Sequence, residues 1–480
     1  MTTILTEPLT GEPETTGAPR GEQVSRRSLL VNTGVAATGA ALVGLHASKA
    51  EAASPVGFLT QTVGGAFAPK ALPPGMPNRD YMPVIVPNGT KAPWKIVNGV
   101  KVFHLVAEEF EHEFAPGLKA FCWGYNKQVN GPILEMVEGD HVRIYLTNKL
   151  IAPTTIHWHG FLIPNGMDGV GGLNQRAVRP GETCRYEFVL GQHGTLMFHS
   201  HHDEMTQMAL GMTGMVIVHP RKPRSHVDRD FALVLHEWRI DPGARRPDPN
   251  EMTDFNVLTI NGKAFPGTAA LVVKTGQKVR IRLANLGAMD HHPFHIHGLN
   301  FIVTDTDGGE IPKSAQFPET TVLVAVGQTR TIEMTPLIPG DWAMHCHMTH
   351  HVMNQMGHRL PNMIGIDPSQ LDAKVQRALP GYMTMGQEGM GDMGDMGMPV
   401  PENSIPMVGA KGKHDYITMG GMFSILKVRD QLTSYEDPGW YENPKGTMAS
   451  LVTSAELARD KIDTAAPSTS APGDVRGVGV

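Results

Sequence analysis

Three cysteines in 480 residues are too few for a disulfide framework. Charged residues make up only 18% of the chain, the net charge is −6, and no run of lysine or arginine occurs. This balance excludes the basic surface on which nucleic-acid-binding proteins depend. We therefore expect no nucleic-acid partner and no disulfide scaffold.

Glycine, proline, methionine and histidine are abundant instead. The 53 glycines and 37 prolines suit a β-rich chain with many turns. The 28 methionines and 23 histidines bring thioethers and imidazoles, which are copper ligands, although methionine also fills cores. The length allows two or three domains with substantial cores.

The first 53 residues have the features of a twin-arginine export signal. Residues 25–31 contain paired arginines, an apolar run extends to Leu45, and the Ala-Glu-Ala of residues 50–52 is typical of a cleavage site. An uncleaved membrane anchor is the alternative, because the apolar run is almost long enough to span a bilayer. We expect export of the folded protein to the periplasm, the cell surface or the medium.

An internal repeat follows residues 54–90, whose proline, glycine and alanine content predicts a linker. The offset between matching segments drifts only from 137 to 148 residues, which predicts homologous domains at 91–222 and 223–369. The matching segments are 139–148 with 276–285, 156–160 with 294–298, 181–188 with 327–334, 198–201 with 344–347, and 215–220 with 363–368.

Apolar and polar residues alternate along VRIYL, CRYEFVL and TRTIEM, and turn residues bound each run, which predicts strands. We expect an all-β fold of two tandem Greek-key β-barrels or sandwiches. Residues 370–412 form a Met/Gly-rich linker in this prediction. Residues 413–480 form a C-terminal extension with one strand within 417–428 and a disordered end.

Four His-x-His pairs stand at matching places in the two halves of the repeat. On a strand, each pair directs two imidazoles to one side, as cooperative metal binding requires. One pair alone is weak support, because core and surface histidines are commoner, but four matched pairs predict a metal cluster. Eight imidazoles suit three coppers. The pairs are His157/His159, His199/His201, His295/His297 and His345/His347.

The segment HCHMTHHVMNQM, residues 345–356, combines one pair with a cysteine. On a strand, Cys346 faces away from His345 and His347. Cysteine, histidine and a weak methionine are the ligands of a blue-copper site. A copper held by the thiolate would then be joined by a few covalent bonds to a metal held by the two histidines, which is a short path for electrons.

The sequence resembles the multicopper oxidases, and among them the two-domain small laccases. HWHG at His157, HSH at His199, HPFHIHG at His292 and the segment at His345 carry this resemblance, which covers about residues 95–368. It implies cupredoxin-like domains and four coppers per chain, one of type 1, one of type 2 and two of type 3. It assigns type 1 copper to His292, Cys346, His351 and Met356, type 2 copper to His157 and His295, and the type 3 pair to His159, His199, His201, His297, His345 and His347.

The first half of the repeat lacks the blue-copper ligands. Ser200 stands where the cysteine should be, Thr154 where the second half has His292, and Met205 where it has His351. We expect electrons to enter only through the second domain. This argues against a copper nitrite reductase, whose family pattern puts the blue-copper cysteine in the first domain.

In the small laccases, the first domain of one subunit meets the second domain of its neighbour in a cyclic homotrimer. A closed ring of such contacts completes every half-site. The resemblance therefore implies a homotrimer with the cluster between subunits, while a cluster within one chain is the alternative.

The resemblance also implies a reaction: one-electron oxidation of phenols or aromatic amines, coupled to four-electron reduction of dioxygen to water. Electrons would enter at His351 or His292 and cross Cys346 to His345 and His347. The alternatives are a metallo-oxidase for cuprous, manganous or ferrous ion, and a copper-sequestering tolerance protein that uses the Met-rich residues 383–398. A flexible linker explains those residues equally well.

Two carboxylates are candidates for delivering protons to dioxygen. Asp168 matches the acidic residue that the family places near the type 2 copper, and the alternative is a turn aspartate before a glycine. Glu204 is the weaker candidate. The remaining cysteines, Cys122 and Cys184, are either buried thiols or an intradomain disulfide.

Overall fold

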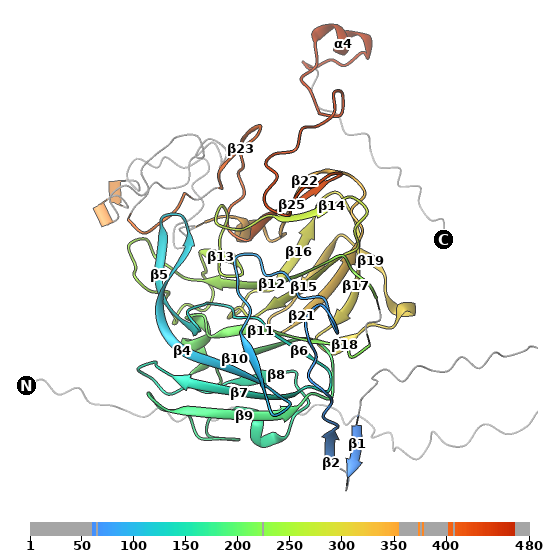
Figure 1. Cartoon of the computed structure of the whole chain (residues 1–480). Helices are drawn as coiled ribbons and strands as arrows, with labels where there is room; N and C mark the ends of the chain where they lie inside the picture. The colour runs from blue at the N-terminus through green and yellow to red at the C-terminus, as the bar shows by residue number, and fades with distance from the viewer. Residues whose placement is uncertain are drawn as a thin grey trace, which may run out of the picture. The chain divides into compact units, whose positions relative to one another are not determined.

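A computed structural model describes residues 60–63, 66–222, 225–354, 373–374, 377–378, 402–406 and 409–465. Strands dominate this part of the chain (Figure 1), so the all-β prediction is confirmed. The predicted export signal, Met356, the repeat segment 363–368 and the Met-rich residues 383–398 lie outside the described residues.

The first sandwich consists of two sheets packed around an apolar core. Strand β7 alternates in burial, with Val142, Ile144 and Leu146 inward, and Trp158 and Phe198 fill the space between the sheets. One sheet contains β3 (Trp94–Val97), β4 (Val100–Ala115), β7 (His141–Asn148) and β9 (Thr183–Val189), with β5 (Leu118–Tyr125) paired to β4. The other orders β6 (Leu134–Val137), β11 (Thr213–His219), β10 (Gly194–His199) and β8 (His157–His159).

The second sandwich repeats this plan. Its core gathers Phe294, Met344 and Cys346 between the two sheets. One sheet orders β13 (Val257–Ile260), β12 (Arg229–Trp238), β15 (Val279–Asn285), β21 (Thr329–Met334), β17 (Phe301–Thr306) and β18 (Gly309–Glu310), with β19 (Pro318–Glu319) on β17. The other orders β14 (Leu271–Lys274), β25 (Phe423–Arg429), β22 (Gly340–Cys346), β16 (His292–Ile296) and β20 (Thr321–Val324).

Short elements connect or flank the sandwiches. The hairpins are β1 (Thr60–Val63) with β2 (Ala66–Pro69), and β23 (Lys411–Gly412) with β24 (Asp415–Tyr416). The helices are α1 (Glu204–Ala209), α4 (Ser454–Arg459), and the 3-10 turns η1 (Asn165–Met167), η2 (Lys313–Ala315) and η3 (Thr349–Val352). Over the described ranges, no helix has the length and apolar character needed to span a membrane.

The second sandwich ends later in the chain than the repeat predicts. Strand β25 pairs antiparallel with β22 and parallel with β14, just as β11 pairs with β10 and β6. The predicted end of this domain at residue 369 is therefore wrong, because the supposed extension supplies a central strand. His199 and His345 are 146 residues apart, whereas Thr213 and Phe423 are 210 apart, so the second half holds 64 additional residues between them. A comparison of the two halves at a nearly constant offset cannot align β25 with β11, because the insertion changes the offset.

Residues 72–91, most of which belong to the predicted linker, form a strap that joins the two sandwiches. Leu72 and Lys91 form β-bridges to the first sandwich, while Ile85 bridges to Phe231 of the second. Val84 is buried in an apolar cluster with residues of β10, β11, β12 and β15. Extended, proline-rich backbone can be hydrogen-bonded one residue at a time without forming a strand, so composition alone did not reveal this role.

Candidate metal centres

One cysteine and two histidines converge in the core of the second sandwich. Sγ of Cys346 lies 3.3 Å from Nδ1 of His351 and 3.8 Å from Nδ1 of His292, and the two Nδ1 atoms are 3.2 Å apart. Strands β22 and β16 are paired neighbours, and η3 returns His351 to them. The structure thus brings together three of the four predicted type 1 ligands, which we call the thiol site. The fourth, Met356, lies outside the described residues.

At the thiol site, a bound metal would displace the proton of the Cys346 thiol and would find His292 already neutral. Burial raises the pKa of the Cys346 thiol to about 12. Burial lowers the pKa of His292, so that this imidazole is neutral and can donate a lone pair. One soft thiolate with two imidazoles is a donor set that suits copper.

Carboxylates stand behind both histidines of the thiol site, and neither was predicted from the sequence. Nε2 of His292 lies 3.4 Å from Oε2 of Glu237, and Nε2 of His351 lies 3.4 Å from Oδ2 of Asp290. Asp290 could have been noticed, because it lies two residues before His292, the first residue of the HPFHIHG segment. Glu237 is remote in sequence, on β12, so only the fold brings it to His292.

Four histidines of the first sandwich form a group on adjacent strands, the first quartet. Strands β8 and β10 place His157 opposite His199, and the ring centroids of neighbouring members of the group are between 5.3 and 6.0 Å apart. Burial lowers the pKa of His199 to about 3 and also lowers the pKa of His159, so both imidazoles are neutral. His157, His159 and His199 offer ring nitrogens within 4.8 Å of one another.

The second quartet has the same construction on β16 and β22. His295 lies opposite His345, Nε2 of His297 is 3.1 Å from Nε2 of His345, and His347 is within 5.6 Å of His345 by ring centroids. The ring of His345 stacks on Phe423, outside the core cluster that contains Cys346. The cysteine and the quartet therefore occupy opposite faces of β22, as the alternation predicts.

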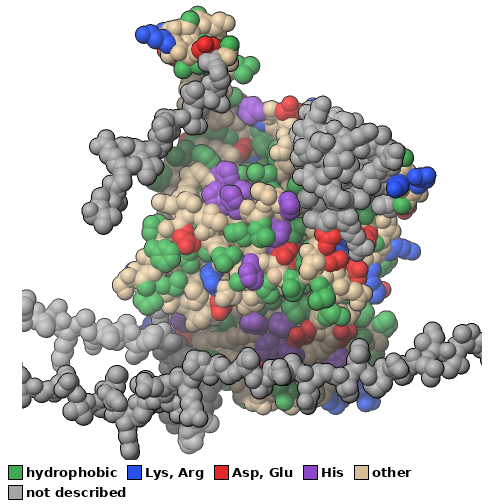
Figure 2. Space-filling view, turned by 180° about the vertical axis from the view of Figure 1, so that it is seen from behind, with side chains coloured by type: hydrophobic (Ala, Val, Ile, Leu, Met, Phe, Trp, Pro, Cys, Tyr) green, Lys and Arg blue, Asp and Glu red, His purple; other side chains and the backbone are tan. Residues whose placement is uncertain are grey.

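The two quartets are separate within one chain. Among the described residues, no group of three or more metal-donor atoms combines members of both, and the ring contacts between histidines stay within each quartet or within the thiol site. Figure 2 shows histidine side chains reaching the surface at several separate places on one face. A cluster that uses all eight imidazoles therefore needs a second copy of the chain or a rearrangement.

Both predicted proton-delivery carboxylates contact the first quartet. Nδ1 of His157 lies 2.9 Å from the carbonyl oxygen and 3.5 Å from Oδ1 of Asp168. Nε2 of His201 lies 2.8 Å from Oε1 of Glu204. The turn interpretation of Asp168 also has support, because Gly169 has φ +94° and a Cβ there would lie 1.7 Å from a backbone oxygen.

The first sandwich fills the position of the thiol site with a hydrogen-bonded network. Oε1 of Gln207 accepts from Ser200 at 2.5 Å and from Thr154 at 2.7 Å, and its amide nitrogen donates to the Pro153 carbonyl at 2.8 Å. The side chain that fills the space is thus Gln207, whereas Met205, the residue aligned with His351, is 59% exposed. The comparison of the two halves did not identify Gln207. Helix α1 changes the spacing after Ser200, so the residue that fills the space is not the one aligned with His351.

The other two cysteines are free thiols. Cys122 is buried in an apolar cluster and Cys184 packs half-buried against the first core. The structure favours the thiol interpretation over an intradomain disulfide.

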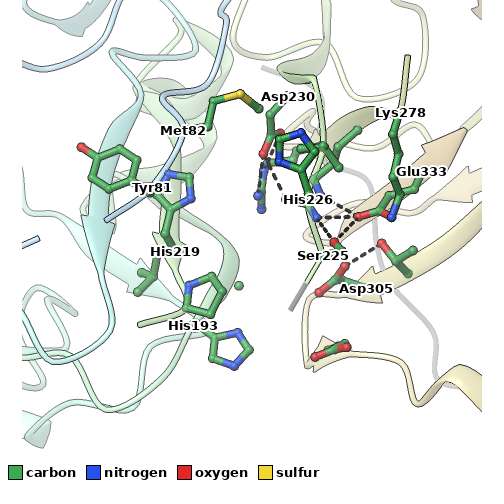
Figure 3. A pocket seen from close by; sticks show the side chains of 18 of the residues that line it. Tyr81, Met82, His193, His219, Ser225, His226, Asp230, Lys278, Asp305 and Glu333 are labelled. Carbon is green, nitrogen blue, oxygen red and sulfur yellow. Dashed lines mark hydrogen bonds and ion pairs between the residues drawn. The ribbon is translucent and has the colours of Figure 1, made fainter. Parts of the chain in front are cut away.

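A separate pocket of about 490 Å³ lies beside the strap (Figure 3). Several of its charged groups pair with one another: Asp230 pairs with Arg282, and Glu333 pairs with Lys278 and Arg280. None of the predicted copper ligands lines it, so this pocket is not part of the metal centres.

Two models of the multicopper oxidase family match the chain, one over residues 107–223 and the other over 241–364. Together they span half of it and contain every histidine of both quartets. The chain belongs to the multicopper oxidase family. Copper is therefore the metal that the family implies for these donors, and the neutral imidazoles and buried thiol suit it.

Relatives within the multicopper oxidase family are distant. Copper resistance protein A of Escherichia coli is 27% identical over 232 residues, which are 38% of each chain. The multicopper oxidase mgLAC has 25% identity and a TM-score of 0.52, with 69% of this chain and 87% of that one covered. The blue copper oxidase of Nitrosomonas europaea has 25% identity and a TM-score of 0.52, with 68% and 85% covered. The chain spans 31–39% of the length of the first four curated relatives it matches.

Proposed function

We propose that this multicopper oxidase is laccase-like and couples one-electron oxidation of phenolic or aromatic amine substrates to reduction of dioxygen to water. The observation that carries the proposal is the strand β22, which presents Cys346 to the thiol site on one face and His345 to the second quartet on the other. Copper bound on both faces would supply the one-electron redox chemistry.

The ligand roles follow the resemblance. Type 1 copper is assigned to the thiol site with Met356, type 2 copper to His157 and His295, and the type 3 pair to the other six quartet histidines, giving four coppers per chain. The exposure of the two ligand histidines supports one of the two possible entry points for electrons over the other. The side chain of His292 has no exposed surface, whereas His351 reaches towards Asp290, whose side chain is 27% exposed. We therefore assign electron entry to the His351 edge.

We propose a homotrimer in which the first quartet of one copy meets the second quartet of another. Exposed apolar side chains lie beside both quartets, as such an interface requires. Leu173, 79% exposed, lies two residues from Gly171, which hydrogen-bonds the His201 carbonyl. Leu323, 52% exposed, lies on β20, the strand that pairs with the His295 strand. Native mass with copper stoichiometry tests this: four coppers per chain in a trimer is expected, and a monomer with one copper contradicts it.

The decisive variant is Cys346→Ser. Without the thiolate, we expect complete loss of the blue absorption and of oxygen uptake with a phenol, while the quartets still bind copper. The matched control is Cys184→Ser, another free thiol that belongs to no group of metal donors. Retention of blue colour and oxidase activity in Cys346→Ser would contradict the assignment.

A metallo-oxidase acting on cuprous, manganous or ferrous ion is the second candidate. The insertion that contains the Met-rich residues 383–398 starts and ends beside the thiol site: Met422 donates a backbone hydrogen bond to His351 at 2.9 Å, and Gly420 donates one to Val352 at 2.6 Å. Oxygen uptake with a phenol is compared with uptake on each metal ion, before and after deletion of residues 381–399. Loss of metal-ion oxidation alone favours the metallo-oxidase.

The name of the Escherichia coli relative also suggests copper tolerance. A sequestering protein would bind copper without consuming oxygen in either assay.

We also propose export by the twin-arginine route. Replacing both Arg26 and Arg27 by lysine should retain the protein in the cytoplasm, which cell fractionation detects. Unchanged export of that variant would contradict the proposal.

A further inference from the structure

Glu237 is a buried carboxylate whose position the fold determines closely. Its side chain has no exposed surface. Oε1 accepts backbone hydrogen bonds from Met289 at 2.6 Å and from Asp290 at 3.0 Å. Within the described part of the chain, its one ion pair is with His292, and no lysine or arginine neutralises it. A buried charge with so little compensation is costly, so its retention calls for a reason.

The ring of His292 is held between the carboxylate and the thiol. Its Nε2 faces Glu237 at 3.4 Å, and its Nδ1 faces Cys346 and His351. An ionised carboxylate only accepts hydrogen bonds, so it favours the tautomer in which Nε2 carries the hydrogen. The lone pair of Nδ1 then points to the thiol site. Carboxylates that hydrogen-bond metal-binding histidines in this way fix the orientation of the ring and raise its basicity.

The surroundings leave the carboxylate little freedom. Glu237 lies on β12, between β13 and β15 in the larger sheet, and the loop before β16 packs directly on it. A Cβ at Gly287 would lie 1.7 Å from Oε2 of Glu237. Two elements thus hold the carboxylate behind His292, whereas Asp290, behind His351, is partly exposed.

We propose that Glu237 is a positioning residue that fixes the tautomer of His292 and supplies a buried negative charge beside the type 1 copper. This rests on the proposed function, because it assumes copper at the thiol site. A cupric ion with the thiolate leaves one net positive charge, which Glu237 would balance, whereas a cuprous ion with the thiolate leaves none. Glu237 therefore favours the oxidised state and lowers the reduction potential.

The test is Glu237→Gln in the full-length, copper-loaded protein. We expect cupric affinity, measured by competition with a chelator, to fall about 10- to 100-fold. We also expect a higher reduction potential and a shifted blue absorption. Asp290→Asn should shift the potential less, because solvent screens its carboxylate.

The matched control is Glu135→Gln. Glu135 is also buried and lies 3.0 Å from the ring of a buried histidine, His219, but it is in the first sandwich. This variant should leave the potential and the blue absorption unchanged.

Wild-type affinity, potential and absorption in folded Glu237→Gln would overturn the proposal. If Glu237→Gln does not fold, Glu237→Asp retains the charge and withdraws the carboxylate by one methylene. Its cupric affinity should still fall, and an unchanged affinity would overturn the proposal. A wild-type protein without a Cys346-dependent blue absorption would instead refute the proposed function.

Discussion

The same position in the two sandwiches holds a thiol site in one and a hydrogen-bonded network in the other. Strand pairing around the position is alike: His157 lies opposite His199, and His295 lies opposite His345. Each sandwich therefore presents a histidine quartet on one face. Only the second places Cys346 on the other face, while the first has Ser200 satisfied by Gln207. The quartet is thus a property of the shared frame, and the thiol site depends on a few side chains within it.

The two sandwiches also differ in how far along the chain the strand that completes each sheet lies, β11 in the first and β25 in the second. In the first, β11 follows β10 after 13 residues, Ser200 to Met212. In the second, the chain leaves after the thiol ligands and returns as β25 beside the same strand. The long insertion of the second sandwich therefore begins and ends beside the point where electrons are proposed to enter.

The largest expected effect comes from removing β25, the strand that completes the second sandwich. Deletion of residues 409–465 should prevent folding of the second sandwich, because β14 and β22 lose their common neighbour and the core loses Met422, Leu426 and Val428. Circular dichroism and copper content measure the outcome. Deletion of residues 448–465 alone, which belong to no sheet, is the control and should leave a blue protein. A folded, blue protein lacking 409–465 would show that β25 is dispensable and that the two closures are not equivalent.

A smaller effect should follow from removing the Gln207 side chain from the hydrogen-bonded network of the first sandwich. Gln207→Ala leaves buried hydroxyls of Thr154 and Ser200 without their acceptor, which should lower the free energy of unfolding by about 1–3 kcal/mol. Urea denaturation measures this, and the blue absorption should not change. Replacing all three side chains by apolar ones of similar size should recover much of the loss, since no polar group is then left unsatisfied. If Gln207→Ala alters the blue absorption, the two positions are coupled.

The third prediction concerns pH. Because burial raises the pKa of Cys346 to about 12, the thiol is protonated in the metal-free protein at neutral pH. Copper must displace that proton, so cupric affinity at the thiol site should rise about tenfold for each pH unit between 6 and 8. Calorimetry in buffers of different ionisation enthalpy should show the released proton. The Cys346→Ser protein should lose this dependence, and a pH-independent affinity in the wild type would mean that the thiol is already ionised.

The sequence predicts features that follow from local spacing. Each His-x-His pair lies on a strand or extends just past its end, so alternation alone predicts both quartets and the opposite orientation of Cys346. Contacts between distant segments escape this reasoning. Glu237 reaches His292 because β12 and β16 lie in facing sheets, and β25 joins β22 across an insertion. The residues 72–91, with no regular period, bridge two sandwiches through single hydrogen-bonded positions.

The strap has a consequence for the order of folding. Val84 bonds Glu135 of the first sandwich, while Ile85 pairs with Phe231 of the second. A ribosome makes the strap well before it makes β12, so residues 72–91 cannot take their final place when they emerge. They must wait for more than a hundred further residues, and the second sandwich must then wait for β25. Such long-range closure is slow. Only a finished chain therefore carries an N-terminal segment tied to both halves, and completion of synthesis becomes a condition for the native fold.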